Sequence, residues 1–141
     1  MSAAGHGPWQ LHAQLAGDTH PVARFALSEL RLMDDANHPW LILVPRVRGA
    51  VELLDLDDAQ QAALTREIAL ASRVLQTLFK PHKLNVAALG NVVPQLHVHV
   101  IARFQTDIAW PRPVWGVAAA RPYPPAQRAR LVERLRGALQ V

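Results

Sequence analysis

The most informative stretch of the sequence is an alternation of residue types at positions 95–101, which reads QLHVHVI. Period-two alternation predicts a β-strand, because successive side chains of a strand point to opposite faces of its sheet. One predicted face is apolar and can enter a hydrophobic core. The opposite face carries Gln95, His97 and His99. The pattern therefore places two imidazoles on one face of a sheet, with their Cβ atoms about 7 Å apart.

Three further stretches of the sequence predict strands. They are residues 25–32, with a turn or bulge at Ser28-Glu29, residues 40–44 and residues 85–89. Residues 40–44 read WLILV between two prolines, which indicates a short buried strand. A polar turn at residues 34–39 leads into it.

Two helices are predicted. Asp57 and Gln60 have the spacing of a capping box at a helix N-terminus, and apolar residues then recur at spacings of four and three. This stripe predicts an amphipathic helix over residues 58–79, which Pro81 ends. A second helix, residues 125–139, has leucines at every fourth position. Several strands in succession with two separate helices predict an α+β domain built on a mainly antiparallel sheet.

The composition is that of one globular domain. The chain has 141 residues, of which 50% are hydrophobic and 18% are charged, so it can bury a single core. The absence of cysteine excludes a disulfide scaffold, a thiolate metal site and a cysteine nucleophile. No apolar run approaches the ~20 residues that span a bilayer, and the first ten residues lack the pattern of a secretory signal. We therefore expect a cytoplasmic protein with no membrane partner.

The net charge of +4 is concentrated near the C-terminus. Residues 121–141 contain five arginines and one glutamate, which alone amounts to +4. The preceding 120 residues contain ten basic and ten acidic side chains and are neutral. A nucleic-acid-binding domain would spread positive charge over one face of the fold. The pattern therefore indicates a solvent-exposed helix face, and no nucleic acid partner is expected.

The histidine pair has three interpretations. A solvent-exposed pair would need no function, although Thr, Lys or Glu would serve equally well on such a face. A catalytic zinc site would need a third ligand, and no diagnostic spacing selects one from the candidates His38, His82, Asp34 and Asp35. In the third interpretation, His97 is a nucleophile toward phosphorus and His99 steadies the phosphoryl oxygens.

The residues that precede the strand favour phosphorus chemistry. Gly90 allows the backbone to approach a ligand closely, and the neighbouring amides can donate to an anion. Asn85 and Asn91 add neutral hydrogen-bond donors. The sequence has no Walker lysine and no glycine-rich helix start, which excludes a P-loop.

Together these residues resemble the signature of the histidine triad (HIT) family of nucleotide hydrolases and transferases, which is His-φ-His-φ-His-φ-φ with φ apolar. Residues 95–101 match the signature at every position but the first, with Asn85 and Gly90-Asn91 ahead of it. Four further features follow the order of the family, namely Asp34, LILVPR at 41–46, the helix at 58–79 and Trp110-Pro111. The resemblance covers residues 25–116. We expect one HIT-like domain, 1–141, with its core at about 20–116 and a proline- and arginine-rich end at 117–141.

The resemblance implies a fold and a reaction. The fold is a mainly antiparallel sheet of about five strands with a long helix and a C-terminal helix. The reaction is cleavage at the α-phosphate of a dinucleoside polyphosphate or a nucleoside phosphoramidate, through a nucleotide covalently bound to His97. The α-phosphate would be held by His99, Asn85 and Gly90. The substrate-binding residues implied are Asp34 (at the ribose), Asn85, Gly90, Asn91 and Trp110. No cofactor is expected, although a divalent cation could accompany the substrate, and the family's two-fold dimers imply a homodimer.

Two positions depart from the family pattern. Gln95 stands where the signature begins with a histidine, and Trp40 stands where many relatives have one. Gln95 supports an alternative function, a nucleotide-binding module with little turnover. A metal-dependent hydrolase that uses His97 and His99 as ligands is a further alternative.

Two finer expectations concern the site. We expect the backbone carbonyl of Gln95 to accept a hydrogen bond from His97 and fix its tautomer, while the Gln95 side chain lies on the same face as His97. In the alternative catalytic role for Gln95, its amide side chain orients the nucleophile or a phosphate oxygen. Apolar packing against the nucleotide base is expected from Phe25 and Leu32.

Overall fold

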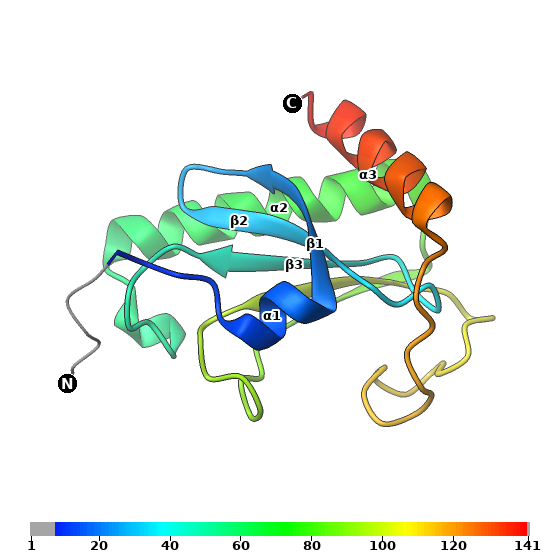
Figure 1. Ribbon diagram of the computed structural model, residues 1–141, viewed down its shortest axis with the longest axis horizontal. Coiled ribbons are helices and arrows are strands. Elements are labelled where there is room, and N and C mark those ends of the chain that lie inside the picture. Colours follow the sequence, from blue (N-terminus) through cyan, green and yellow to red (C-terminus); the bar gives the residue numbers. More distant parts are fainter. Residues whose placement is uncertain (1–7, 141) are drawn as a thin grey trace.

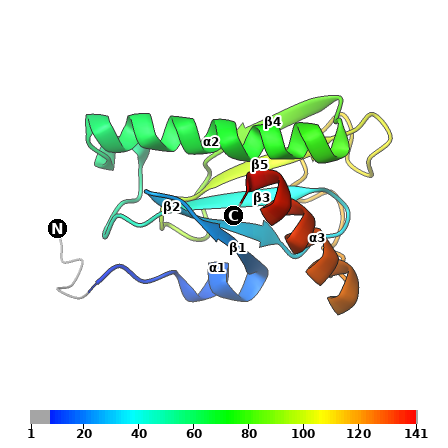
Figure 2. The same ribbon diagram turned by 90° about the horizontal axis from the view of Figure 1, so that it is seen from above.

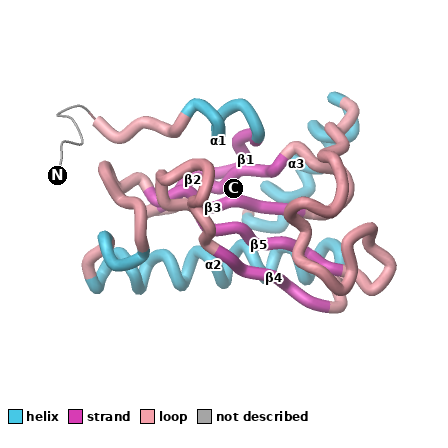
Figure 3. Tube along the Cα trace, turned by 90° about the horizontal axis from the view of Figure 1, so that it is seen from below, coloured by secondary structure: helices cyan, strands magenta, loops and turns pink. Residues whose placement is uncertain are grey.

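An antiparallel sheet of five strands forms the centre of the computed structural model, which describes residues 8–140. The strand order is β1-β2-β3-β5-β4; Figure 1 labels β1, β2 and β3, and Figure 3 labels all of these strands. In chain order the elements are α1 (Ala13–Asp18), β1 (Thr19–Arg24), β2 (Ser28–Met33), β3 (Trp40–Pro45), η1 (Leu53–Asp55), α2 (Asp58–Phe79), β4 (Lys83–Ala87), β5 (Val98–Arg103) and α3 (Pro125–Leu139). This architecture confirms the predicted α+β class with a long helix and a C-terminal helix. The prediction about a secretory signal falls mainly on residues 1–7, which lie outside the described residues.

The two faces of the sheet have separate hydrophobic clusters. On β3, Leu41 and Leu43 join the cluster formed with α2 and α3, whereas Ile42 and Val44 belong to a second cluster on the opposite face. Helix α1 packs on this second face through Leu15. Figure 2 shows β1, β2 and β3 lying between α2 and α1. Because every residue of β3 is buried, the predicted buried strand is confirmed.

Helix α2 begins as the sequence predicts. The Asp57 carboxylate accepts a hydrogen bond from Gln60 N (2.8 Å), and the Gln60 side chain accepts one from Asp57 N (2.9 Å). This reciprocal pair is the predicted capping box. The helix ends at Phe79, after which Lys80 adopts the left-handed conformation with φ 49°. Its apolar stripe, including Leu75, enters the first cluster.

One charged side chain of α2 is buried beside this cluster. Glu67 is only 5% exposed, and its carboxylate oxygens accept hydrogen bonds from Leu27 N (2.8 Å) and Ser28 N (3.0 Å). Leu27 ends the turn between β1 and β2 and Ser28 begins β2, and Phe25 N donates to Ser28 O across this turn. A buried N–H needs an acceptor. Helix α2 supplies this acceptor through the Glu67 carboxylate, because no backbone carbonyl of the turn does so.

The prediction for residues 25–32 is wrong in its first half. Strand β1 ends at Arg24, and residues 25–27 form the turn. Pro21 and the polar residues around it hide β1 in the sequence. The sheet tolerates this proline because β1 is an edge strand with a bulge between Pro21 and Ala23. The second half is confirmed as β2.

The histidine-bearing strand starts later than predicted. Strand β5 begins at Val98, so residues 95–97 lie in the loop that leads into it. The alternation of faces is confirmed nevertheless, because Val98 joins the first cluster while His97 and His99 line a cavity on the opposite face. Strand β4, Lys83–Ala87, lies two residues earlier than predicted.

Helix α3 packs against α2 and β1, with Leu135 1% exposed. Its arginines point outward, as predicted, but some also make contacts. Arg136 Nε donates to Val22 O (2.7 Å), and the Arg134 guanidinium lies 5.5 Å from the centre of the Phe79 ring. Over residues 8–140, no helix is long and apolar enough to span a bilayer.

Candidate active site

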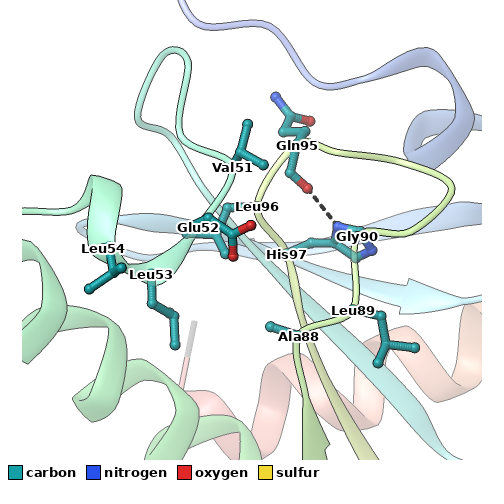
Figure 4. A pocket seen from close by; sticks show the side chains of 10 residues that line it. All are labelled: Val51, Glu52, Leu53, Leu54, Ala88, Leu89, Gly90, Gln95, Leu96 and His97. Atoms are coloured by element: carbon teal, nitrogen blue, oxygen red, sulfur yellow. Dashed lines mark hydrogen bonds between the residues drawn. The ribbon is translucent and has the colours of Figure 1, made fainter.

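His97 is held by the backbone immediately before it. Its Nδ1 lies 2.7 Å from the carbonyl oxygen of Gln95 (Figure 4). A carbonyl oxygen can only accept, so Nδ1 carries the proton and Nε2 keeps its lone pair when the ring is neutral. This geometry confirms the role predicted for the Gln95 carbonyl. The backbone thus leaves a potential nucleophile at Nε2, in a side chain whose residue is only 7% exposed.

His99 is held in the opposite tautomer by Trp40. The indole Nε1 of Trp40 donates to His99 Nδ1 at 3.0 Å. Because the indole can only donate, Nδ1 must be unprotonated, and the proton of the neutral ring lies on Nε2. Burial, together with the nearby His97, lowers the pKa of His99 to about 4. Near neutral pH, His99 is therefore an uncharged donor through Nε2.

The two rings lie together, with centroids 4.9 Å apart. Their neutral forms are complementary, because His97 presents a lone pair at Nε2 and His99 presents an N–H at Nε2. A nucleophile beside a hydrogen-bond donor is suited to attack on phosphorus and to stabilisation of the oxygens that gain charge.

Both histidines line a cavity of about 410 Å³, called here the histidine cleft. It is formed by Gln14, Leu15, Asp18, Met33, Trp40, Ile42, Leu89, Gly90, Asn91, Val92, Val93, His97, His99 and Trp115. Most of this lining is apolar or aromatic, with a few polar groups near the imidazoles, as is usual for small-molecule sites. A neighbouring cavity of about 440 Å³ shares Asp18, Met33, Trp40 and Trp115 with it.

Two of the residues predicted to contact phosphate lie in this cleft. Gly90 and Asn91 are both part of its lining. Gly90 has φ +74°, in the left-handed region that favours glycine. The structure thus places this turn beside His97, as the sequence predicts.

Asp34 lines the neighbouring cavity instead. Its carboxylate accepts from Tyr123 N (2.9 Å) and lies 3.3 Å from His20 Nε2. Burial raises the pKa of Asp34, but the hydrogen bond from Tyr123 and the contact with His20 outweigh it, and the net pKa is lowered. The carboxylate is thus ionised near neutral pH and anchors the C-terminal segment.

Asn85 and Trp110 lie together, away from the cleft. The side-chain oxygen of Asn85 accepts from Arg103 (2.7 Å), and the same guanidinium lies 5.6 Å from the centre of the Trp110 ring. Arg103 is itself fixed by Asp107, with Nε 2.8 Å from the carboxylate. Neither Asn85 nor Trp110 belongs to the lining of the histidine cleft.

Trp115 occupies the position at the cleft that the sequence suggested for Trp110. Its ring meets those of His99 and Trp40 edge-on, with centroid distances of 5.0 and 5.7 Å. Helix α1, which supplies Gln14, Leu15 and Asp18 to the lining, is also absent from the sequence-based prediction. It has only six residues, too few for a clear amphipathic pattern.

One expectation about the site is wrong. Leu32 is buried in the cluster shared with α2 and α3, and Phe25 packs against the same cluster. Both therefore lie on the opposite face from the histidines and cannot contact a base in the histidine cleft. The Gln95 side chain lines a cavity together with His97, but its amide does not turn toward the imidazole. It points toward residues 10–12 instead.

The zinc interpretation lacks a third ligand. Among residues 8–140, no three His, Cys, Asp or Glu side chains lie close enough to hold a metal ion. Of the proposed third ligands, His38 contacts Asp107 and Asp34 contacts His20.

Comparison with known proteins gives concordant results. The HIT domain family matches residues 16–106. A crystal structure of a histidine triad protein from Bradyrhizobium japonicum is 48% identical, covers 94% of this chain and 99% of its own, and has a TM-score of 0.92. Another, from Marinobacter aquaeolei VT8, is 46% identical over 95% of this chain and 98% of its own, also with a TM-score of 0.92.

One relative of known activity matches about half of the chain. The AP-4-A phosphorylase of Mycobacterium tuberculosis is 34% identical over a match of 76 residues that covers 50% of this chain. This chain spans only 39% of the length of that relative. The family match and the two structures carry the assignment: with its paired imidazoles beside a glycine turn on one face of the sheet, the chain belongs to the HIT domain family.

Proposed function

We propose that the protein is a nucleotidyl hydrolase or transferase that cleaves nucleotide conjugates at the α-phosphate through a nucleotidyl-histidine intermediate. The observation that carries this proposal is the pair of complementary tautomers, with His97 bonded to the Gln95 carbonyl and His99 to the Trp40 indole. The relationship to AP-4-A phosphorylase over 76 residues supports a nucleotide substrate.

The reaction has two displacements at phosphorus. In the first, the Nε2 lone pair of His97 forms a bond to the α-phosphorus. The bond from phosphorus to the leaving oxygen or nitrogen breaks, and the leaving group takes a proton from water. In the second, a water or another hydroxyl acceptor forms a P–O bond and loses its proton, and the bond to His97 breaks. Nε2–H of His99 donates to a phosphoryl oxygen in both steps.

The nucleoside would occupy the apolar part of the histidine cleft. Gly90 and Asn91, which line the cleft, would contact the phosphate, and Asp34, in the adjoining cavity, is our candidate for the ribose hydroxyls. The chemistry requires no cofactor, and a divalent cation would enter only with the substrate.

A homodimer is part of the proposal. Strand β4 forms one edge of the sheet, and its residue Val86 is 49% exposed. An uncovered edge can pair with a second copy, which would give a continuous sheet across a two-fold axis. In such a dimer, Asn85 and Trp110 near this edge are candidates for contacts with the partner's cleft.

A test uses a nucleoside phosphoramidate and a diadenosine polyphosphate as substrates. We expect a burst of leaving group followed by slower turnover, and an acid-labile nucleotide on His97. Replacing His97 by Ala should reduce kcat more than ~10³-fold while nucleotide affinity changes only a few-fold. His82→Ala, a histidine outside the cleft, is the matched control. Binding without turnover in the wild type would instead establish a nucleotide-binding module.

A further inference from the structure

The Gln95 side chain makes two hydrogen bonds to a distant part of the backbone. Its Nε2 donates to the carbonyl of Gln10 (2.8 Å), and its Oε1 accepts from His12 N (2.8 Å). Figure 4 shows the amide pointing away from the ring of His97. The two halves of this residue thus have different partners, since its carbonyl holds His97 and its side chain holds residues 10–12.

The bound segment leads directly into a wall of the histidine cleft. Residues 9–12, called here the N-terminal strap, precede α1, and Trp9 and Leu11 pack against the cluster beneath the cleft. His12 caps α1, because its Nδ1 accepts from Gln14 N (3.0 Å). Gln14 is itself part of the cleft lining.

Helix α1 is otherwise held at its C-terminal end, where Asp34 N donates to Asp18 O (3.0 Å) and Thr19 Oγ1 donates to Leu15 O (2.5 Å). It contains six residues, of which only Leu15 is buried. So short a helix is not stable by itself in water. Its position therefore depends on the strap on one side and β1 on the other.

The pair of bonds requires an amide. A glutamine side chain has both an N–H donor and a carbonyl acceptor, whereas a carboxylate has only acceptors and would face the Gln10 carbonyl without a proton to donate. Alanine removes both bonds. A neutral imidazole also has one donor and one acceptor, but its Nδ1 is one bond closer to the backbone than the amide O and N, so the ring does not place both groups where Gln95 does.

We propose that Gln95 is a positioning residue for the substrate: by fastening the N-terminal strap it fixes α1 as a wall of the histidine cleft. This role rests on the proposed function for its effect on substrate, but the attachment of the strap is independent of it. The departure from the family signature thus replaces an imidazole by an amide that holds the strap, and the chemistry uses only the backbone carbonyl of residue 95.

The experiment compares Gln95→Glu, Gln95→Ala and Gln95→His with the wild type. With a nucleoside phosphoramidate we expect KM to rise about ten-fold in each variant, because the loss of two neutral hydrogen bonds can weaken binding by this factor. The value of kcat should change less than about three-fold. The Kd for adenosine monophosphate should rise in parallel. Hydrogen exchange of amides 13–18 should accelerate in all three.

The matched control is Gln61→Glu. Gln61 also binds the backbone through its amide, with Nε2 2.9 Å from Leu56 O, but it lies outside the cleft. This variant should leave KM, kcat, and exchange at amides 13–18 unchanged.

Three results would overturn the proposal. The first is unchanged exchange at amides 13–18 in Gln95→Glu. The second is a fall in turnover by two orders of magnitude or more with KM unaltered, and the third is a large gain in turnover in Gln95→His. If the wild type neither turns over nor binds adenosine monophosphate, the proposed function fails, and the exchange measurement still decides whether Gln95 holds the strap.

Discussion

Lowering the pH from 7 to 5 is expected to reduce the free energy of unfolding by about 2 kcal/mol through His99 alone. The pKa of His99 is lowered to about 4 in the folded protein by burial and by His97, against about 6.5 in an unfolded chain. At pH 5 the unfolded imidazole is almost fully protonated, whereas roughly a tenth of the folded population carries this proton. Protons therefore favour the unfolded state between about pH 6.5 and pH 4, and stability falls as the pH falls through this window.

The assay is urea unfolding at several pH values between 7 and 5, for the wild type and for His99→Gln. Glutamine does not titrate, so the variant should lose the component of the pH dependence that belongs to His99. Contributions from His38, whose pKa burial also lowers, are common to both proteins and cancel in the difference. The pKa values of Asp34 and Asp107 are lowered, so their contributions to the free energy of unfolding fall only below about pH 4, outside the range of the assay.

Equal pH dependence in the two proteins would refute the lowered pKa of His99. It would mean that the imidazole binds a proton in the folded state as readily as in the unfolded one. The folded ring would then be protonated at pH 5, where the Trp40 indole could not donate to Nδ1, since a protonated ring has no lone pair there.

Two further predictions concern single contacts. Replacing Trp40 by Phe removes the donor to His99 Nδ1 but keeps an aromatic ring, so kcat should fall about ten-fold with a smaller change in KM. Nitrogen-15 NMR should then show a mixture of His99 tautomers, and an unchanged Nε2–H form would disprove the role of Trp40. Leu135→Ala should lower the free energy of unfolding by about 2–5 kcal/mol, because this side chain is 1% exposed between α3 and the sheet. Turnover at 25 °C should be nearly normal, and a loss of activity in a fully folded Leu135→Ala protein would show that α3 acts on the site.

The parts of the fold that the sequence predicts well are those with strong local signals. The capping box of Asp57 and Gln60 and the apolar stripe after it define α2 without help from tertiary contacts. Strand β3 is equally clear because prolines limit an apolar run. Strand β1 escapes prediction because its proline is tolerated only at a sheet edge, and the sequence does not say which strand is the edge.

The sequence predicts the centre of the site and not its walls. The spacing of His97 and His99 and the nearby Gly90 are local features, so the sequence alone identifies them. Trp115 and α1 reach the cleft through long-range packing that no periodicity records. The direction of the Gln95 amide depends on the chain leaving the extended conformation before β5, which the continuous alternation of residues 95–101 conceals.

The Glu67 carboxylate couples the β1–β2 hairpin to α2 in a way that bears on cooperativity. If the hairpin opened alone, the Leu27 and Ser28 amides would leave an ionisable group buried against apolar side chains without its donors. Such partial opening costs free energy. The hairpin and α2, whose contact joins residues about 40 positions apart in the chain, should therefore come apart together in one cooperative step. A sheet edge that carries an irregular strand is thereby kept from fraying by a contact made on the other side of the core.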